Sequence, residues 1–130
     1  NQGTAGWLAV TAVVLNRVND KRFPNTICDV IKQGPSRPSW QNKNIRIPIK
    51  YRCQFSWYCD GKHDNPNHKG KAWKVSQNIA EYVLQNPGML DITDSATHYY
   101  ADYIPAPRWA KERDKTVKID THIFYNKSIL

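Results

Sequence analysis

The sequence is poor in glutamate, in cysteine and in long apolar runs. Its 130 residues include two glutamates, Glu81 and Glu112, and three cysteines. The longest apolar stretch, residues 7–15, falls well short of the roughly 18 to 20 residues that a membrane-spanning helix requires. No positively charged segment precedes this stretch, so it does not resemble a secretory signal. We therefore expect one soluble domain with a single core.

Negative charge is also scarce. Eleven Asp and Glu side chains stand against nineteen Lys and Arg, which gives a formal net charge of +8. Such a surface attracts polyanions, a class that includes nucleic acids, anionic lipids and bacterial wall polymers. The basic residues are dispersed and no DNA-reading motif accompanies them, so we expect no specific nucleic-acid binding. With 40% hydrophobic residues, five Trp and seven Tyr, the chain is not disordered.

Three helices are predicted from the spacing of apolar residues. Residues 4–18 are apolar on almost every side, which is typical of a helix buried on most faces. Residues 26–33 form a shorter candidate that a Gly-Pro pair ends. In residues 71–85, apolar side chains recur at helical spacing before an Asn-Pro-Gly sequence stops the pattern.

The remaining segments predict a small amount of strand. Residues 35–51 contain three prolines and few apolar anchors, so we expect an irregular excursion over the surface. Segments 96–100 and 116–125 are rich in β-branched and aromatic residues and predict an antiparallel pair. The predicted fold class is α+β, mainly helical, with a small antiparallel sheet.

The densest group of reactive side chains lies in the segment CQFSWYCDGKHDNPNH. Cys53, Cys59, His63 and His68 have the ligand types of a structural zinc site, but paired zinc cysteines are usually about two to four residues apart. We therefore predict no metal site and no cofactor. The cysteines permit one intramolecular disulfide, either within this segment or from Cys28 to one of the other two. Free thiols are the alternative in a reducing compartment.

Catalytic candidates are few. Carboxylate-driven glycoside cleavage needs an acid whose pKa an apolar environment raises. Neither glutamate fits, because Glu81 lies on the polar face of the third predicted helix and Glu112 lies in the charged sequence KERDK. His98 and His122 lie in the two predicted strands, and we expect strand alternation to bring them to the same face. The aromatic residues around them are typical of a cleft for carbohydrates or nucleobases.

Five separated blocks of the sequence resemble one known family. They are AGWLAVTAVVLNRVNDKRFPNTICDVIKQG, CQFSW, ATHYYAD, P-x-W-A and THIFY, in this order. Together they resemble the SleB/CwlJ family of cell-wall hydrolases, which includes spore-cortex lytic enzymes and related phage endolysins. The resemblance covers nearly the whole chain. Only residues 35–51 and 63–71 do not resemble the family's sequences. It implies a single lysozyme-like, lytic-transglycosylase-like domain over residues 1–130.

The resemblance also implies a reaction. Family members cleave peptidoglycan between N-acetylmuramic acid and N-acetylglucosamine and leave a 1,6-anhydro-muramyl end. A single glutamic acid protonates the glycosidic oxygen, and its carboxylate then assists attack by the muramyl 6-hydroxyl. In the family this glutamate lies in a Glu-Ala-Arg or Glu-Ser-Arg motif just before the position of Asn1. We therefore expect the general acid upstream of Asn1, and the chain as given to lack this motif and its turnover. A non-catalytic peptidoglycan-binding module and a hydrolytic muramidase are the alternatives.

Ten residues that match the family's blocks would line its glycan groove. The aromatic ones would stack on sugar rings, and the polar ones would hydrogen-bond to N-acetyl and hydroxyl groups. We expect a monomer that binds peptidoglycan glycan strands and acts at the bacterial cell wall, in the periplasm or outside the cell, as a phage endolysin or an exported bacterial protein. The ten residues are Gln54, Phe55, Ser56, Thr97, His98, Tyr99, Tyr100, Trp109, His122 and Phe124.

Overall fold

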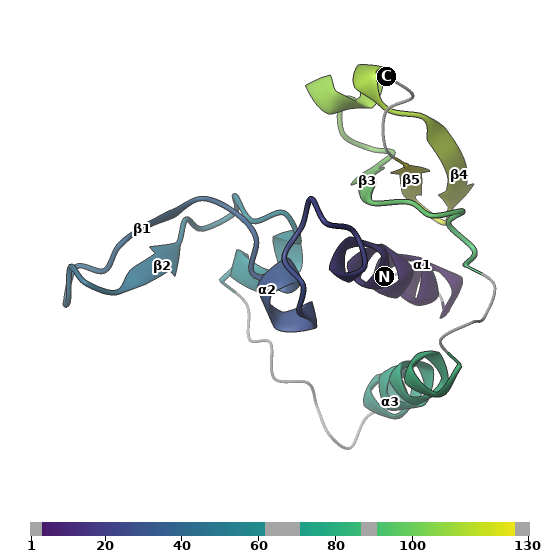
Figure 1. Ribbon diagram of the computed structural model, residues 1–130, viewed down its shortest axis with the longest axis horizontal. Helices are drawn as coiled ribbons and strands as arrows, with labels where there is room; N and C mark the ends of the chain where they lie inside the picture. The colour runs from purple at the N-terminus through teal and green to yellow at the C-terminus, as the bar shows by residue number, and fades with distance from the viewer. Residues whose placement is uncertain (1–3, 62–70, 87–90, 127–130) are drawn as a thin grey trace.

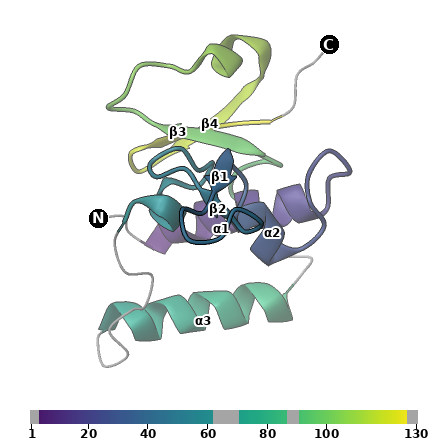
Figure 2. The same cartoon turned by 90° about the vertical axis from the view of Figure 1, so that its left-hand side faces the viewer.

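The computed structural model describes residues 4–61, 71–86 and 91–126. Its elements form layers, with helix α1 (Thr4–Val18) between a three-stranded sheet and helix α3 (Lys71–Gln85) (Figures 1 and 2). The short helix α2 (Ile27–Ile31) lies beside α1. Both long helices have the bounds that the apolar spacing predicts. None of the described helices is long and apolar enough to cross a bilayer.

Helix α1 is the centre of the core. Every residue from Gly6 to Val18 is at least partly buried, which matches its nearly continuous apolar sequence. The sheet covers it on one side, and α2 and the segment around Phe55 cover it on another. The buried apolar cluster consists of Ala9, Val13, Val14, Val30, Phe55, Ala96 and Phe124.

The main sheet has the strand order β3-β5-β4, with β3 spanning His98–Ala101, β4 Lys115–Ile119 and β5 His122–Tyr125. All pairings are antiparallel. The predicted pair is present as β3 and β5, but segment 116–125 is not one strand. Asp120 adopts a left-handed conformation, with a φ of 52°, and the chain reverses there between β4 and β5. The sheet therefore gains a third strand, and β5 becomes its centre.

A second, smaller sheet lies within residues 35–51. Strands β1 (Ser36–Pro38) and β2 (Arg46–Pro48) pair as an antiparallel hairpin that extends away from the layers (Figure 1). The predicted irregular excursion is therefore wrong for these strands. Each is only three residues long and contains proline, so it carries no readable alternation.

The fold class is α+β with antiparallel sheets, as predicted, but a mainly helical fold is not confirmed. The three α-helices have 15, 5 and 15 residues, fewer than half of the described chain. Helix α2 begins one residue later than predicted because Thr26 caps it, and it ends two residues earlier, at Ile31. The Thr26 hydroxyl accepts a hydrogen bond from the Asp29 N–H at 3.1 Å, which fixes the start of the helix.

A buried arginine joins three segments of this fold. Arg17, on the last turn of α1, is only 2% exposed. Its Nε donates to the Thr97 carbonyl oxygen at 2.7 Å, just before β3, and a terminal nitrogen donates to Gln33 Oε1 at 2.9 Å. The rings of Phe23 and Phe55 lie 4.5 and 5.5 Å from the guanidinium carbon. Burial lowers the pKa of Arg17 to about 10, so the side chain remains charged at neutral pH.

Replacing Arg17 with Met should destabilise the domain strongly. The substitution keeps an apolar stem but leaves the Thr97 carbonyl and the Gln33 side chain without their donor, which should cost about 2 to 4 kcal/mol. Urea denaturation followed by circular dichroism measures the loss. Arg22→Met is the matched control, because its ion pair with Asp20 lies at the surface and its removal should change stability by less than about 1 kcal/mol. Equal losses in the two variants would contradict a structural role for Arg17.

Candidate functional site

One face of the main sheet belongs to the core. Tyr99 pairs with Phe124 across β3 and β5, and their rings stack with centroids 5.6 Å apart. On the same face, Tyr99 meets the His122 ring at 5.2 Å and the Phe55 ring at 6.1 Å. Phe55 and Phe124 are fully buried. Neither ring offers a surface to a sugar, so Phe55 and Phe124 act as core residues of this fold.

The opposite face carries a second aromatic group. Tyr100 stacks on Tyr125 at 5.9 Å, and Trp109, from the short helix η2 (Arg108–Glu112), lies edge-on to both rings. The His98 ring lies 5.0 Å from the Trp109 ring. Tyr100 and Trp109 are partly exposed, so this face can present ring surface and polar ring atoms to a ligand. We refer to His98, Tyr100, Trp109 and Tyr125 as the outer aromatic group.

The two histidines do not share a face, so that prediction is wrong. His98 lies opposite Tyr125, whereas His122 lies opposite Ala101 at the other end of the pairing. Side chains alternate along β5, so positions 122 and 125 point to opposite sides of the sheet. The register, which the sequence does not show, decides this point.

His98 is held in its neutral form. Burial lowers its pKa to about 3, and the positive charges of Arg17, Arg113 and Arg22 act in the same direction. Its Nδ1 lies 3.0 Å from the Thr97 hydroxyl. At neutral pH the imidazole therefore carries one donor and one acceptor, which suits hydrogen bonding to a neutral polar ligand better than proton donation.

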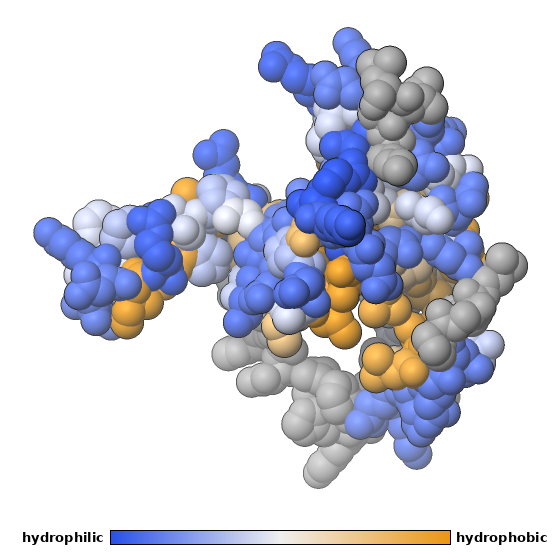
Figure 3. All heavy atoms as spheres, in the orientation of Figure 1, coloured by the Kyte–Doolittle hydropathy of each residue, from blue (hydrophilic) through white to orange (hydrophobic). Residues whose placement is uncertain are grey.

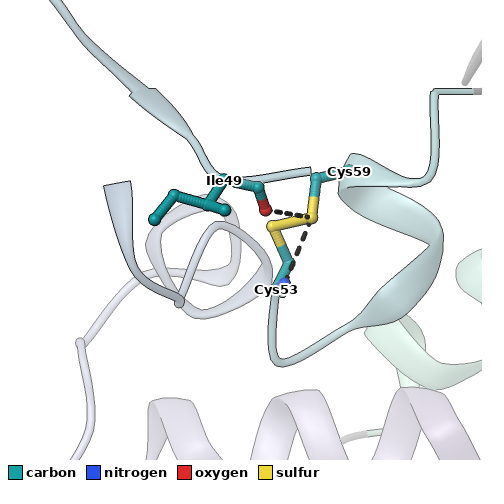
Figure 4. The surroundings of a disulfide bond; sticks show 3 residues. All are labelled: Ile49, Cys53 and Cys59. Atoms are coloured by element: carbon teal, nitrogen blue, oxygen red, sulfur yellow. Dashed lines mark hydrogen bonds between the residues drawn. A yellow bond between two sulfur atoms is a disulfide. The ribbon is translucent and has the colours of Figure 1, made fainter. Parts of the chain in front are cut away.

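The segment between Cys53 and Cys59 is closed by a disulfide (Figure 4). The Cys53 N–H points at the Cys59 sulfur at 3.2 Å, and that sulfur lies 3.4 Å from the Ile49 carbonyl oxygen. Cys28 is a free thiol at the surface. Of the alternatives open from the sequence, the structure thus has the local bridge. Within the loop Gln54 is exposed, as a ligand contact requires, while the Ser56 side chain lies outside the described part.

A polar cavity of 690 Å³ opens beside the C-terminal end of α1. Thr97 is the predicted site residue that lines it. The other lining side chains are amides, hydroxyls and charges that the sequence-based prediction did not include. They are Asn16, Asn19, Asp20, Lys21, Arg22, Ser95 and Asn126. The buried Asn126 Oδ1 atom has no hydrogen-bond partner among the described residues, so an acceptor is left for a ligand or solvent.

Asp91 fixes the loop before β3. Its carboxylate accepts from the Asn16 amide at 2.8 Å and from the Thr93 N–H and hydroxyl at 2.8 and 2.7 Å. A further bond comes from the Ser95 N–H. Partial burial raises its pKa, but these hydrogen bonds outweigh that effect and hold the pKa below its usual value. Asp91 is therefore a structural anion and not a proton donor.

The polar residues Asn16 and Arg17 were missed as functional candidates. Arg17 continues the 3-4 spacing of the partly buried Val10 and the buried Val13 and Val14. A charged residue in line with the apolar residues on one face of the helix was therefore the sequence signal that could have identified Arg17. Asp91 and Asn126 gave no comparable signal, because their partners are distant in sequence.

The zinc-type ligand pattern of the sequence falls only in part on described residues. Within the described residues, no three His, Cys, Asp or Glu side chains lie close enough to hold a metal ion. His63 and His68 lie outside the described residues. The two cysteines of the zinc pattern are in the disulfide and do not supply thiolates.

An α+β domain with partly exposed aromatic rings and a cavity lined by polar side chains has the groups with which proteins bind carbohydrates. The chain is a member of the Cell Wall Hydrolase family, whose sequence profile matches residues 1–125. This confirms the family identified from the five sequence blocks. Membership makes the domain one that degrades the bacterial cell wall polymer, peptidoglycan.

Two solved structures have a similar fold. The catalytic domain of SleB from Bacillus anthracis, described as a germination-specific lytic transglycosylase, is 27% identical with a TM-score of 0.63, over 97% of this chain and 82% of that one. The catalytic domain of the Bacillus cereus SleB protein is 24% identical with a TM-score of 0.61, over 97% and 78% of the two chains. No curated protein matches the sequence.

The disulfide should stabilise the site loop. Cys53 and Cys59 lie six positions apart in the sequence, and in the chain-entropy model a loop of this length contributes roughly 2 kcal/mol. The double change Cys53→Ser with Cys59→Ser should lower the midpoint of thermal unfolding, and a reductant should then have no further effect. Cys28→Ser is the control and should unfold like the unaltered chain. If the double variant were as stable as this control, the bridge would have no stabilising role.

His98 should make stability depend on pH. Because its folded-state pKa lies near 3, and the unfolded value is about 6.5, the unfolded chain binds more protons between these limits. The contribution of His98 to the free energy of unfolding is therefore fully present above pH 6.5. It is lost as the pH drops towards 3, by at most about 1.4 kcal/mol per pH unit. His122, whose pKa burial also lowers, adds a smaller effect of the same sign.

Urea denaturation at pH 7 and pH 5 measures this dependence. The range from pH 5 to pH 7 avoids the effect of Asp91, whose lowered pKa changes stability only under more acidic conditions. His98→Gln should reduce the difference between the two pH values, and His122→Gln should reduce it less. An unchanged difference in His98→Gln would contradict a neutral, buried His98.

Proposed function

We propose that this domain cleaves peptidoglycan glycan strands by lytic transglycosylation. The bond broken joins N-acetylmuramic acid to N-acetylglucosamine, and the muramyl unit ends as its 1,6-anhydro form. The observation that carries this proposal is the similarity to the SleB catalytic domain over 97% of this chain, because that domain is described as a lytic transglycosylase.

The general acid is the first requirement of the reaction, and no described glutamate meets it. Glu81 lies exposed on α3, where its carboxylate accepts from Gln85. Glu112 is also exposed. Neither lies in the apolar surroundings that a general acid of this reaction requires. Asp91 is excluded as a donor by its hydrogen bonds. We therefore assign the acid to a glutamate preceding Asn1, on the N-terminal side of α1, as the family resemblance implies.

Such a glutamate would act twice. As the acid, it gives its proton to the glycosidic oxygen, and the N-acetylglucosamine unit leaves as an alcohol. As the carboxylate, it takes the proton of the muramyl 6-hydroxyl while that oxygen bonds to the anomeric carbon. Water is not consumed, so the reaction needs no second carboxylate nucleophile.

The residues of this chain bind and position the glycan in this proposal. Tyr100 and Trp109 offer partly exposed ring surface for sugar contacts. His98 is largely buried and its Nδ1 is engaged by the Thr97 hydroxyl at 3.0 Å, so its other ring nitrogen is the one that can bond to an N-acetyl or hydroxyl group. The polar cavity beside Thr97 supplies further donors and acceptors. Gln54 adds an exposed amide from the disulfide loop.

The proposed site of action is the bacterial cell wall, in the periplasm or outside the cell. A disulfide persists in these oxidising compartments and is rare in the cytosol, so the Cys53–Cys59 bridge supports this location. We also propose that the domain acts as a monomer.

A non-catalytic peptidoglycan-binding module is the second candidate. The observation in its favour is that no described glutamate is suited to be the acid. The residues encoded before Asn1 distinguish the two: a Glu-Ala-Arg-like motif supports the enzyme and its absence supports the module.

Digestion of purified peptidoglycan tests the reaction directly. The protein with its native upstream residues should release anhydro-muropeptides, each one water lighter in the mass spectrum than a hydrolytic product. A change of the upstream glutamate to Gln should abolish release but leave binding to insoluble peptidoglycan intact. The 130-residue chain alone should bind with little or no turnover. Reducing ends that carry the added water would identify a muramidase instead, and robust activity of the 130-residue chain would mean that the acid lies within it.

A further inference from the structure

The hairpin of β1 and β2 presents an aromatic side chain far from the core. Residues 35–52, which we call the arm, project from the layered body (Figures 1 and 3). Trp40 is 89% exposed and Ile45 is 54% exposed. Trp40 follows β1 in the tip, which the Ser39 N–H closes by donating to the Ile45 carbonyl at 2.8 Å. An isolated exposed apolar residue is ordinary, but a Trp ring at the end of a projecting hairpin is a large exposed aromatic surface.

Positive charge surrounds this ring. The arm contains five basic residues and no Asp or Glu. The Arg37 guanidinium carbon lies 5.6 Å from the centre of the Trp40 ring, a cation–π distance. Arg46 donates to the Ser36 hydroxyl and carbonyl at 3.1 and 2.7 Å, which holds its head group on the same hairpin. The arm thus pairs an aromatic ring with ordered cations, a combination that complements an anionic ligand with apolar faces.

The other side chains of the tip indicate which polyanion fits. Gln41, Asn42, Lys43 and Asn44 are all exposed. Amides beside an aromatic ring are the groups that bind a sugar, whose hydroxyls need donors and acceptors and whose ring has an apolar face. A segment built to enter a bilayer would carry several apolar residues at its tip. Here Trp40 and the half-exposed Ile45 stand among three amides and Lys43, so the tip favours a charged carbohydrate polymer over a lipid surface.

The base of the arm is fastened to the body. Gln33 and Gln54 are joined by a backbone hydrogen bond of 2.9 Å, and the Tyr51 N–H donates to the Cys59 carbonyl at 2.9 Å. Gly34 has a φ of 149°, and a Cβ atom there would lie 2.9 Å from the Cys53 Cα, so only glycine fits this approach. The same loop that carries the disulfide therefore sets the direction of the arm.

We propose that the arm is a second, non-catalytic binding surface for peptidoglycan. Trp40 stacks on a sugar ring, and Arg37, Lys43 and Arg46 bind carboxylates of the peptide stems. The inference takes its polymer from the proposed function but does not depend on the reaction. The arm lies in a part of the sequence that does not resemble the rest of the family. It would therefore add affinity for the cell wall to a fold that family members share.

Sedimentation of the 130-residue chain with insoluble peptidoglycan tests this surface. Trp40→Ala should bind about tenfold more weakly, because the variant loses the aromatic contact with the sugar ring. The triple change Arg37→Gln, Lys43→Gln, Arg46→Gln should also bind about tenfold more weakly, because it removes three weak, exposed ion contacts together. Peptidoglycan whose carboxylates have been capped as neutral amides should lose the effect of the triple change and keep the effect of Trp40→Ala.

Matched variants serve as controls. Tyr103→Ala removes another exposed aromatic ring, and a second triple change removes three exposed lysines elsewhere, so the net charge falls equally. The lysines are Lys32, Lys74 and Lys111. All variants should keep the thermal unfolding midpoint of the unaltered chain, since the altered side chains are exposed or make only local contacts on the hairpin.

Three results would overturn the inference. These are binding by Trp40→Ala equal to that of Tyr103→Ala, equal binding by the two triple variants, and tighter Trp40-dependent binding to phosphatidylglycerol vesicles than to peptidoglycan. The last result would make the arm a membrane contact. Product analysis reports on the reaction and sedimentation reports on the arm, so either proposal can fail while the other stands.

Discussion

The structure depends on one buried charge. The Arg17 guanidinium joins the end of α1 to the Thr97 carbonyl before β3 and to Gln33 before the arm. A buried cation is costly unless its donors are used, and here a carbonyl, an amide and two aromatic faces take the place of a carboxylate. The arrangement positions the sheet relative to the helix. It also adds positive charge beside His98, which helps to keep that imidazole neutral.

The main sheet shows how a short sequence serves both core and surface. In the run His98–Ala101, Tyr99 points to the core, where Phe124 and Phe55 meet it, while Tyr100 points to the outer aromatic group. Burial raises the pKa of Tyr99 to about 12, so its hydroxyl stays protonated. A family block of consecutive aromatics is therefore not one functional surface, because alternation divides it between stability and recognition.

The disulfide loop links the site to the arm. The Cys53–Cys59 bridge closes the loop that carries the exposed Gln54. The Cys59 carbonyl also accepts a hydrogen bond from the Tyr51 N–H at the base of the hairpin. A two-stranded hairpin has little stability alone, so an arm of this size needs a fixed base to hold its tip in one place. The proposed glycan groove and the proposed second wall contact would thus share a single covalent support.

The sequence alone determined the elements whose signals are local. Residues 4–18 and 71–85 are helical as predicted, since apolar spacing and Pro, Gly and Asn boundaries act within a few residues. The family followed from five ordered blocks, now matched over residues 1–125. Tertiary structure decided the rest. The partners of Arg17 and Asp91 are distant in sequence, the turn at Asp120 split one predicted strand, and strand register placed His98 and His122 on opposite faces. Each depends on which segments meet in space, because packing and hydrogen bonding between distant residues leave no periodic pattern in the chain.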